Sequence, residues 1–180
     1  MARSEANATS ITFSDSAFTN TWHIMGSLQS QAGGNEAMET AYVSNPVAGP
    51  YTITAAYGHT GGVNKTGMVC AEYAGVASSN PLDAFAFGNN SSGATVGRTS
   101  AFSTSKAGLV VVFMTTDHTN GTFSAGAIGS HTATLRTSHD TDGGLEDTTF
   151  SSLQSNITAS MNFSASNHLI TMAGAFKAGP

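Results

Sequence analysis

Residues 109–128 read Leu-Val-Val-Val-Phe-Met-Thr-Thr-Asp-His-Thr-Asn-Gly-Thr-Phe-Ser-Ala-Gly-Ala-Ile. The run from Leu109 to Met114 is apolar at every position, which is typical of a strand buried on both faces near the centre of a sheet. Asn120-Gly121 follows as the strongest two-residue hairpin signal in the chain, and a second strand pattern extends from Thr122 to Ile128. The stretch therefore predicts two antiparallel neighbours in an all-β fold.

Outside this stretch, apolar residues recur with a period of two. Tyr51, Ile53, Ala55 and Tyr57 alternate with polar or small residues, as expected for a strand with one buried face. Clusters of Gly, Asn and Ser, such as residues 89–93, separate about a dozen runs of this kind. The pattern predicts an antiparallel β-sandwich, jelly-roll-like, with about 12 short strands and no substantial helix; an up-and-down barrel is the alternative.

Domain organisation follows from length and composition. A chain of 180 residues is expected to form one domain with a core of its own. Residues 1–10 are polar and are predicted to form an N-terminal arm, disordered or laid on a neighbouring subunit, with a single β-sandwich domain over 11–180. A second apolar run, Gly67 to Ala71, is predicted to be a central strand, which makes Cys70 a small buried core residue. Because Cys70 is the one cysteine, no intrachain disulfide forms.

The chain is poor in charge. Charged residues are 9% of the sequence, against about 25% in an average soluble domain, while 23 Ser and 24 Thr supply much of the polarity. Six Lys and Arg residues, none adjacent to another, do not form the basic footprint of a nucleic-acid binder. The longest apolar run, Leu109 to Met114, is far shorter than the 18 or so residues of a membrane span, so no membrane insertion is expected.

The segment Ala71-Glu72-Tyr73-Ala74-Gly75, followed by Asn80-Pro81-Leu82-Asp83, resembles a motif of bacterial and phage surface β-sandwich modules. Leu145-Glu146-Asp147 and the closing Ala173-Gly174-Ala175-Phe176-Lys177 fit the same resemblance. It implies two antiparallel sheets in a jelly-roll-like sandwich and a setting in surface or secreted proteins, and it implies no reaction. Physically, Glu72 and Tyr73 point to opposite faces, and Pro81 favours an extended Asn80, so the motif is interpreted as a structural corner.

Asp140, Asp142, Glu146 and Asp147 form the one acidic cluster in the sequence. Alternating carboxylates followed by Gly-Gly resemble the start of a loop that binds a hard cation, and Ca²⁺ takes six to eight oxygen ligands. The flanking helices and the terminal bidentate Glu of an EF-hand are missing. The cluster is therefore predicted either to bind calcium or to be a solvated hairpin turn with Asx-turn hydrogen bonds; no other cofactor is expected.

Aromatic residues beside polar ones raise the question of a glycan site. Trp22, Tyr57 and His59 are the candidate ligand-binding residues, because sugar-binding sandwiches present flat aromatic rings next to amides and carboxylates. Trp22 and Tyr57 also lie in strand patterns, where packing in the core is the ordinary role of an aromatic ring. Both interpretations stay open at this point.

No catalytic motif stands out. The six histidines lack metal-site spacing, and no Gly-x-Ser-x-Gly occurs, so no enzymatic activity is expected. Three features together favour a structural protein of the virion surface, such as a capsid decoration protein or a fibre head domain: low charge, no disulfide, and no apolar leader at residue 1. Its expected partners are other copies of itself or other virion proteins. The alternative is a carbohydrate-binding or adhesion module at a bacterial cell surface or outside the cell.

Overall fold

Strands make up all of the regular secondary structure in the computed structural model, which describes residues 1–5, 8–16, 20–30, 36–60, 65–117, 120–139 and 143–180. They are β1 (Ala2–Glu5), β2 (Ala8–Asp15), β3 (Trp22–Ile24), β4 (Gln29–Ser30), β5 (Glu36–Glu39), β6 (Ala41–Val43), β7 (Ile53–His59), β8 (Thr66–Met68), β9 (Leu82–Arg98), β10 (Gly108–Thr116), β11 (Phe123–Ile128), β12 (His131–Thr132), β13 (Thr134–His139), β14 (Gly143–Phe150) and β15 (Ala159–Lys177). The predicted all-β, antiparallel, sandwich-like fold is confirmed. Within the described ranges there is no helix that could cross a membrane.

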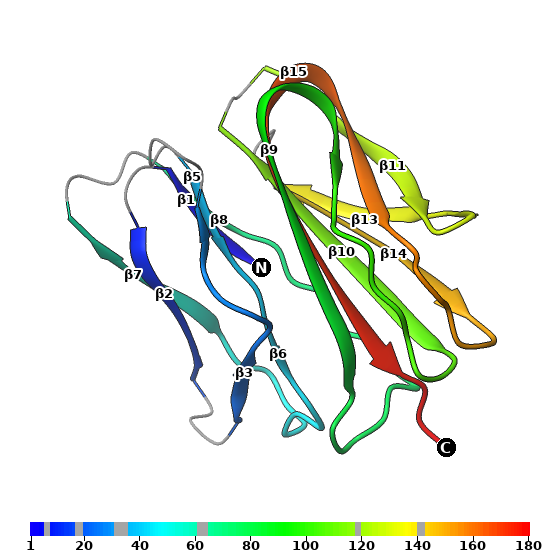
Figure 1. The fold of residues 1–180 in the computed structure, drawn as a ribbon. Coiled ribbons are helices and arrows are strands. Elements are labelled where there is room, and N and C mark those ends of the chain that lie inside the picture. The colour runs from blue at the N-terminus through cyan, green and yellow to red at the C-terminus, as the bar shows by residue number, and fades with distance from the viewer. Residues whose placement is uncertain (6–7, 17–19, 31–35, 61–64, 118–119, 140–142) are drawn as a thin grey trace.

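Two long strands organise the C-terminal half. The first part of β15, residues 159–163, pairs with β11 and with the end of β9, whereas residues 169–177 lie between β10 and the beginning of β9. Register shifts between Asn162 and Asn167 mark the bend between these parts. Figure 1 shows both long strands turning over at the top of the molecule. The sheet is thereby rolled into a nearly closed barrel, and the turn predicted at residues 89–93 is a bend within β9.

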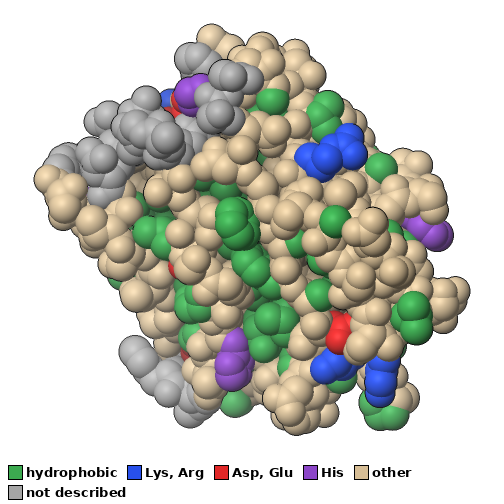
Figure 2. Space-filling view, viewed as in Figure 1, with side chains coloured by type: hydrophobic (Ala, Val, Ile, Leu, Met, Phe, Trp, Pro, Cys, Tyr) green, Lys and Arg blue, Asp and Glu red, His purple; other side chains and the backbone are tan. Residues whose placement is uncertain are grey.

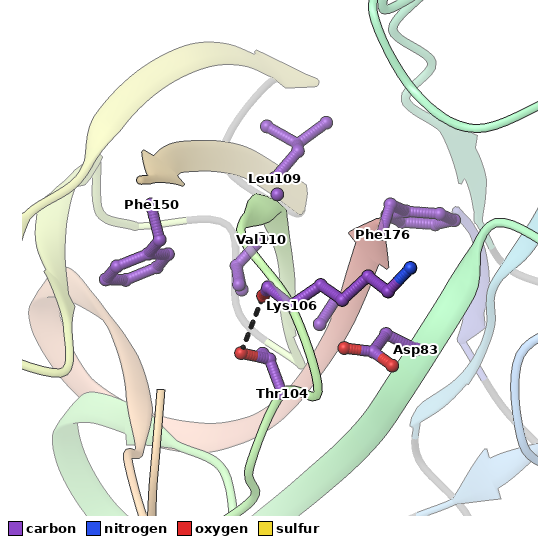
Figure 3. Close-up of a pocket in the computed structure, with 9 residues that line it drawn as sticks. Asp83, Thr104, Lys106, Leu109, Val110, Phe150 and Phe176 are labelled. Carbon is purple, nitrogen blue, oxygen red and sulfur yellow. Dashed lines mark hydrogen bonds between the residues drawn. The ribbon is translucent and has the colours of Figure 1, made fainter. Parts of the chain in front are cut away.

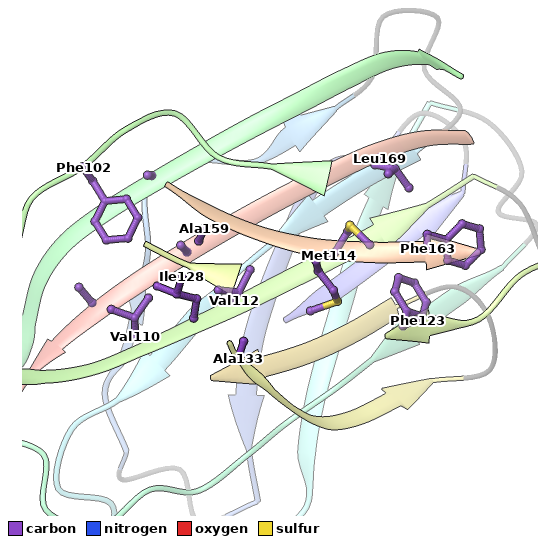
Figure 4. Close-up of a cluster of buried hydrophobic side chains, with 14 of the residues drawn as sticks. Phe102, Val110, Val112, Met114, Phe123, Ile128, Ala133, Ala159, Phe163 and Leu169 are labelled. Atoms are coloured by element: carbon purple, nitrogen blue, oxygen red, sulfur yellow. The ribbon is translucent and has the colours of Figure 1, made fainter. Parts of the chain in front are cut away.

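The inside of the barrel is apolar. Alternate residues of β10, among them Val110, Val112 and Met114, point inward and meet side chains of β9, β11 and β15. Figure 4 shows these side chains converging inside the barrel, with Phe123 and Phe163 near each other at one end. Their ring centroids are 5.0 Å apart. Because alternate residues of a strand face opposite sides, the other residues of β10 serve a second core.

Two further layers cover the outer face of the barrel. The four-stranded sheet β4-β5-β1-β8 packs on that face, and the core between it and the barrel contains Leu109, Val111 and Phe113 of β10 together with four buried methionines, Met1, Met25, Met38 and Met172. The ribbon β2–β7 covers the opposite face of this sheet over a small core of Ala2, Ala8, Ile11 and Ala37. Figure 1 shows the ribbon, the four-stranded sheet and the barrel one beside another. The prediction that Leu109–Met114 is buried on both faces is confirmed.

The N-terminal arm predicted for residues 1–10 is wrong. Residues 2–5 form β1, which pairs with β5 on one side and β8 on the other, and Ala2, Arg3 and Ser4 are almost completely buried. The polar sequence is accommodated because the guanidinium of Arg3 donates a 3.0 Å hydrogen bond to Glu36 on β5. The hydroxyl of Thr115 on β10 donates to the same carboxyl at 2.7 Å. A polar terminus thus becomes an inner strand through partners distant in sequence.

Two other strand predictions fail. The run Gly67–Ala71 does not form a central strand, because β8 ends at Met68 and lies at the edge of its sheet, and Cys70 is exposed. The hairpin predicted around Asn120-Gly121 does not form either, since β10 is flanked by β14 and β15 and β11 pairs with β15. Gly121 lies against the ring of Phe163, where any Cβ would overlap that ring. Its small size, and not a tight turn, explains glycine at this position.

Candidate functional site

The described part of the predicted calcium cluster is divided between two sides of one strand. Glu146 and Asp147 are consecutive on β14 and therefore point to opposite faces. Glu146 lies opposite Val112, on the side of the barrel interior, and Asp147 lies opposite Val111, on the side of the N-terminal layers. These two carboxylates do not share a site. Asp140 and Asp142 lie outside the described residues.

Glu146 is a buried carboxyl in the wall of the barrel. Its Oε2 accepts a 2.8 Å hydrogen bond from the backbone N–H of Gly126 on β11. Burial raises its pKa to about 7, and the nearby charge of Asp147 also raises it, while the bond from Gly126 acts in the opposite direction. Oε1 has no hydrogen-bond partner among the described residues. The group can therefore change its protonation near neutral pH.

Asp147 is the centre of a polar clamp. Arg136 on β13 donates two hydrogen bonds to its carboxylate, at 2.7 and 2.8 Å, and the hydroxyl of Tyr73 donates a third at 2.7 Å. Burial and the Asp147 carboxylate together raise the pKa of Tyr73 far above its usual value, so this hydroxyl keeps its proton. The clamp attaches the segment between β8 and β9 to the barrel.

The clamp explains much of the segment that carries the surface-module resemblance. Glu72 is exposed and Tyr73 is half-buried against the core between the layers, as the interpretation of a structural corner expects. The backbone of Gly75 has φ = +77°, where glycine is favoured. The expected extended conformation of Asn80 is wrong: its φ is +46°, in the left-handed region that Asn tolerates better than most residues.

The three candidate glycan residues are engaged in internal contacts. The indole N–H of Trp22 donates to Asp15 at 2.8 Å, and its ring stacks on Phe13 at 5.6 Å between centroids. The hydroxyl of Tyr57 donates to the carbonyl of Gly67 at 3.3 Å. Tyr57 stacks on His59 near the beginning of β2, whereas Trp22 lies at the other end of that strand. The structure brings Tyr57 and His59 together and leaves Trp22 apart from them.

Metal-ligating side chains are dispersed. In the described ranges, no group of three or more His, Cys, Asp or Glu residues could hold a metal ion. His168 and Asp117 form a pair, with 3.3 Å between Nδ1 and Oδ2. This pair lies where β10 ends and β15 bends.

A small hollow lies at the lower end of the barrel. It has no enclosed space for even a water molecule and is lined by Asp83, Thr104, Lys106 and Phe176 among others. Figure 3 shows the stem of Lys106 running across it, with the hydroxyl of Thr104 donating to the carbonyl of Lys106 at 3.1 Å. The carboxylate of Asp83 accepts a 2.6 Å hydrogen bond from the backbone N–H of Ser105. Sites for drug-sized ligands usually measure about 300–1,000 Å³, so this hollow suits none of them.

Sequence reasoning missed an aromatic seam along the junction of the N-terminal layers and the barrel. The seam consists of His23, Tyr42, Phe85, Phe87 and Phe176. His23 stacks on Tyr42 at 5.1 Å between centroids, Tyr42 meets the edge of Phe176 at 5.4 Å, and Phe85 stacks on Phe87 at 6.4 Å. Figure 2 shows hydrophobic side chains gathered in a strip down the middle of this face. The alternation of Phe85 and Phe87 with alanines was the available signal.

The seam is the open edge of the core between the layers. Tyr42, Phe85 and Phe176 pack against that core and are only partly buried, while Phe87 remains 44% exposed. Gly26 lies directly against Phe85 with φ = +84°, and a Cβ there would overlap the ring. The amide of Asn89 donates to the carbonyl of Ser30 at 3.0 Å, just beyond Phe87. The two halves of the molecule are therefore closely packed beneath rings that stay accessible.

Comparison with protein-family models, curated proteins and solved structures finds no match for this chain.

Proposed function

We propose that this chain is a non-enzymatic structural protein of a virion surface, a capsid decoration protein or fibre head domain, that works through contacts between copies. The observation that carries the proposal is the position of the carboxylates. Five of them are buried: Asp15, Glu36, Glu39, Glu146 and Asp147. Six of the seventeen charged residues of the chain, these five and Arg3, are thus inside the protein, and Ser, Thr and Asn supply much of the polar surface.

Such a surface suits association. Burying an ion against another protein requires the loss of its hydration, which is costly unless the ion finds a good partner. A surface of Ser, Thr, Asn and Gly avoids most of that cost and still offers hydrogen bonds at the rim of an interface. The exposed, unbridged Cys70 also suits a chain that folds in a reducing compartment before particle assembly.

The contacts of three aspartates support a non-enzymatic role. Asp147 is held by Tyr73 and Arg136, Asp15 by Trp22, and Asp83 by Ser105. Each of these carboxylates already serves a structural contact within the fold. A general acid or base must instead be free to reach a substrate proton.

The proposal is tested by the mass of the purified protein in solution. Size-exclusion chromatography with light scattering, run over a wide range of protein concentration, is expected to give a discrete oligomer. Addition of EDTA is expected to leave that oligomer unchanged. A monomer at every concentration would contradict the proposal, as would a defined catalytic turnover that is lost when a buried carboxylate is replaced.

A further inference from the structure

We infer that the aromatic seam of His23, Tyr42, Phe85, Phe87 and Phe176 is the surface through which one copy of this chain contacts a second copy. The inference rests on the proposed function and specifies where the contact between copies is made. Three observations carry it: incomplete burial of the rings, the absence of Asp, Glu, Lys and Arg from the seam, and the rigidity of its support.

The exposure of the seam contrasts with that of the phenylalanines inside the barrel. Inside the barrel Phe163 is 2% exposed, whereas Phe87 is 44% exposed. The exposure of Phe87 does not come from a frayed strand end, because Phe87 pairs with Met172 of β15. Phe85 and Phe87 lie on the face of β9 that looks away from the barrel interior, since the alternate residues Ala84 and Ala86 pack inside it. Covering Phe87 would complete the core between the layers at its open edge.

The chemistry of the seam favours a second copy over a charged partner. None of its five residues carries a carboxylate, ammonium or guanidinium group. In a two-fold dimer the same patch occurs on both subunits, so any charge in it would meet a like charge close to the axis. An aromatic patch without Asp, Glu, Lys or Arg is self-complementary in this respect.

The nearest charged side chains in sequence are already engaged. Asp83, two residues before Phe85, accepts hydrogen bonds from the backbone and hydroxyl of Ser105. Lys177, next to Phe176, donates to the carbonyl of Asn80 at 3.2 Å. Neither is needed at the seam, and both can remain at the rim of an interface.

The support of the seam is preorganised. Tyr42 is held between His23 and Phe176, and Phe85 is held between Phe87 and Gly26. Rigid aromatic rings at the centre of a patch, with hydroxyl and amide groups around them, match the usual anatomy of an interface core and rim. Fixed rings lose little conformational entropy on binding, so most of the gain from burying Phe87 is retained.

The test uses Phe87→Ser, because this ring is 44% exposed and its loss is expected to leave the fold intact. The matched control is Leu153→Ser, which removes a side chain that is 59% exposed in the connection between β14 and β15. His23→Ala is a second seam variant, at an exposed ring on another strand. Thermal melts and circular dichroism of each variant establish that it is folded.

Sedimentation or light scattering then gives the dissociation constant of the dimer. Phe87→Ser is expected to raise it at least about tenfold, His23→Ala is expected to raise it less, and Leu153→Ser is expected to leave it unchanged. An oligomer that persists unchanged in Phe87→Ser would overturn the seam as the contact while leaving the proposed function standing. A wild-type chain that is monomeric throughout overturns the proposed function itself. If the protein is a monomer that binds specific glycans on an array, and Phe87→Ser abolishes that binding, the partner of the seam is a sugar and not a second copy.

Discussion

The barrel and the N-terminal layers are built from the same kind of strand but hold together differently. In the described residues the barrel encloses fifteen buried apolar residues, including Phe123, Phe150 and Phe163. The core between the ribbon β2–β7 and the four-stranded sheet has four buried residues, three of them alanine. Stability from burial scales with apolar area, so the barrel can sustain itself while the N-terminal layers depend on it.

The layer between the two halves shows how this dependence is met. The core between the two halves is rich in methionine, whose side chain is unbranched and flexible. Such side chains can fill the irregular space between a sheet of short strands and the larger sheet of the barrel. At one end of this layer, Arg3 and Glu36 replace apolar contacts by a buried polar link that reaches Thr115 on β10. Small strands thus gain a fixed position from one directional contact that hydrocarbon packing alone would not supply.

The largest effect on stability is expected from a Phe→Ala substitution in the barrel, compared with a Phe→Ala substitution in the N-terminal layers. Phe163→Ala removes a fully buried ring from the barrel and is expected to lower the free energy of unfolding by about 3 to 5 kcal/mol. Phe13→Ala removes a partly buried ring above the small core and should cost clearly less. Urea denaturation followed by fluorescence and by circular dichroism measures both.

Hydrogen exchange provides the control for this pair. Amides of β10 and β15 should exchange more slowly than those of β2 and β7 in the wild-type protein, because opening the ribbon exposes less apolar surface. Equal losses for Phe163→Ala and Phe13→Ala, with equal protection of the two regions, would show that the halves form a single cooperative unit of uniform stability.

The difference between the halves also decides what the sequence could predict. Two barrel strands were readable, because β10 is continuously apolar and β14 follows the turn signals closely, whereas the turn signal at residues 89–93 concealed the continuity of β9. β1 was not readable, because the buried Arg3 donates to Glu36, which lies 33 residues away. Its polar sequence therefore indicated an arm. Similarly, Asn120-Gly121 obeys the local rule for a hairpin, but both edges of β10 are occupied by other strands.

The candidate sites show the same limit. The alternation rule could have separated Glu146 from Asp147, because consecutive residues of a strand face opposite sides. The contacts of Trp22 with Phe13 and Asp15 depend on β2 and β3 lying together, which no local pattern indicates. The aromatic seam required the packing of β9 beside Gly26, a contact between distant parts of the chain. Local period predicts which face a residue occupies, and tertiary packing decides what that face meets.

The second prediction removes the link between the halves. Glu36→Leu takes away the carboxyl that Arg3 and Thr115 bond, and the stability is expected to fall by about 3 kcal/mol, because breaking a buried ion pair at one partner is costly. The double variant Arg3→Met, Glu36→Leu is expected to recover much of the loss, since both polar groups are then replaced by apolar ones. Chemical denaturation of the three proteins gives the coupling energy. A double variant less stable than Glu36→Leu alone would contradict this account.

The third prediction uses pH to probe the barrel wall. Burial raises the pKa of Glu146 from 4.5 to about 7, so between these values the folded protein keeps a proton that the unfolded chain has lost. The contribution of this group to stability is therefore complete below about pH 4.5 and is lost as the pH rises through 7. The wild-type free energy of unfolding should fall by about 2 to 3 kcal/mol over this window because of Glu146, whereas Glu146→Gln stays neutral and should not show this decrease.

Urea titrations at a series of pH values measure that difference. Glu72→Gln, at an exposed carboxylate, is the control and should follow the wild-type profile. If Glu146→Gln loses stability with rising pH as steeply as wild type does, the carboxyl of Glu146 is not the group that titrates. Water would then reach this carboxyl more readily than its contact with the N–H of Gly126 indicates.

The smallest effect is expected at the clamp that attaches the segment 69–81 to the barrel. Tyr73→Phe removes one hydroxyl that donates to the buried carboxylate of Asp147, and it should cost about 1.5 to 2 kcal/mol, near the lower end for a bond to a charged group. The two hydrogen bonds from Arg136 remain, so the carboxylate is not left without partners. Arg136→Gln is the matched comparison, and its loss should be smaller, because solvent replaces an exposed guanidinium more readily than a half-buried hydroxyl. Salt separates the two contributions: added NaCl should reduce the effect of Arg136→Gln and leave that of Tyr73→Phe almost unchanged. A larger loss at Arg136 than at Tyr73 would mean that the exposed strand β13, and not the segment 69–81, is what Asp147 secures to the barrel.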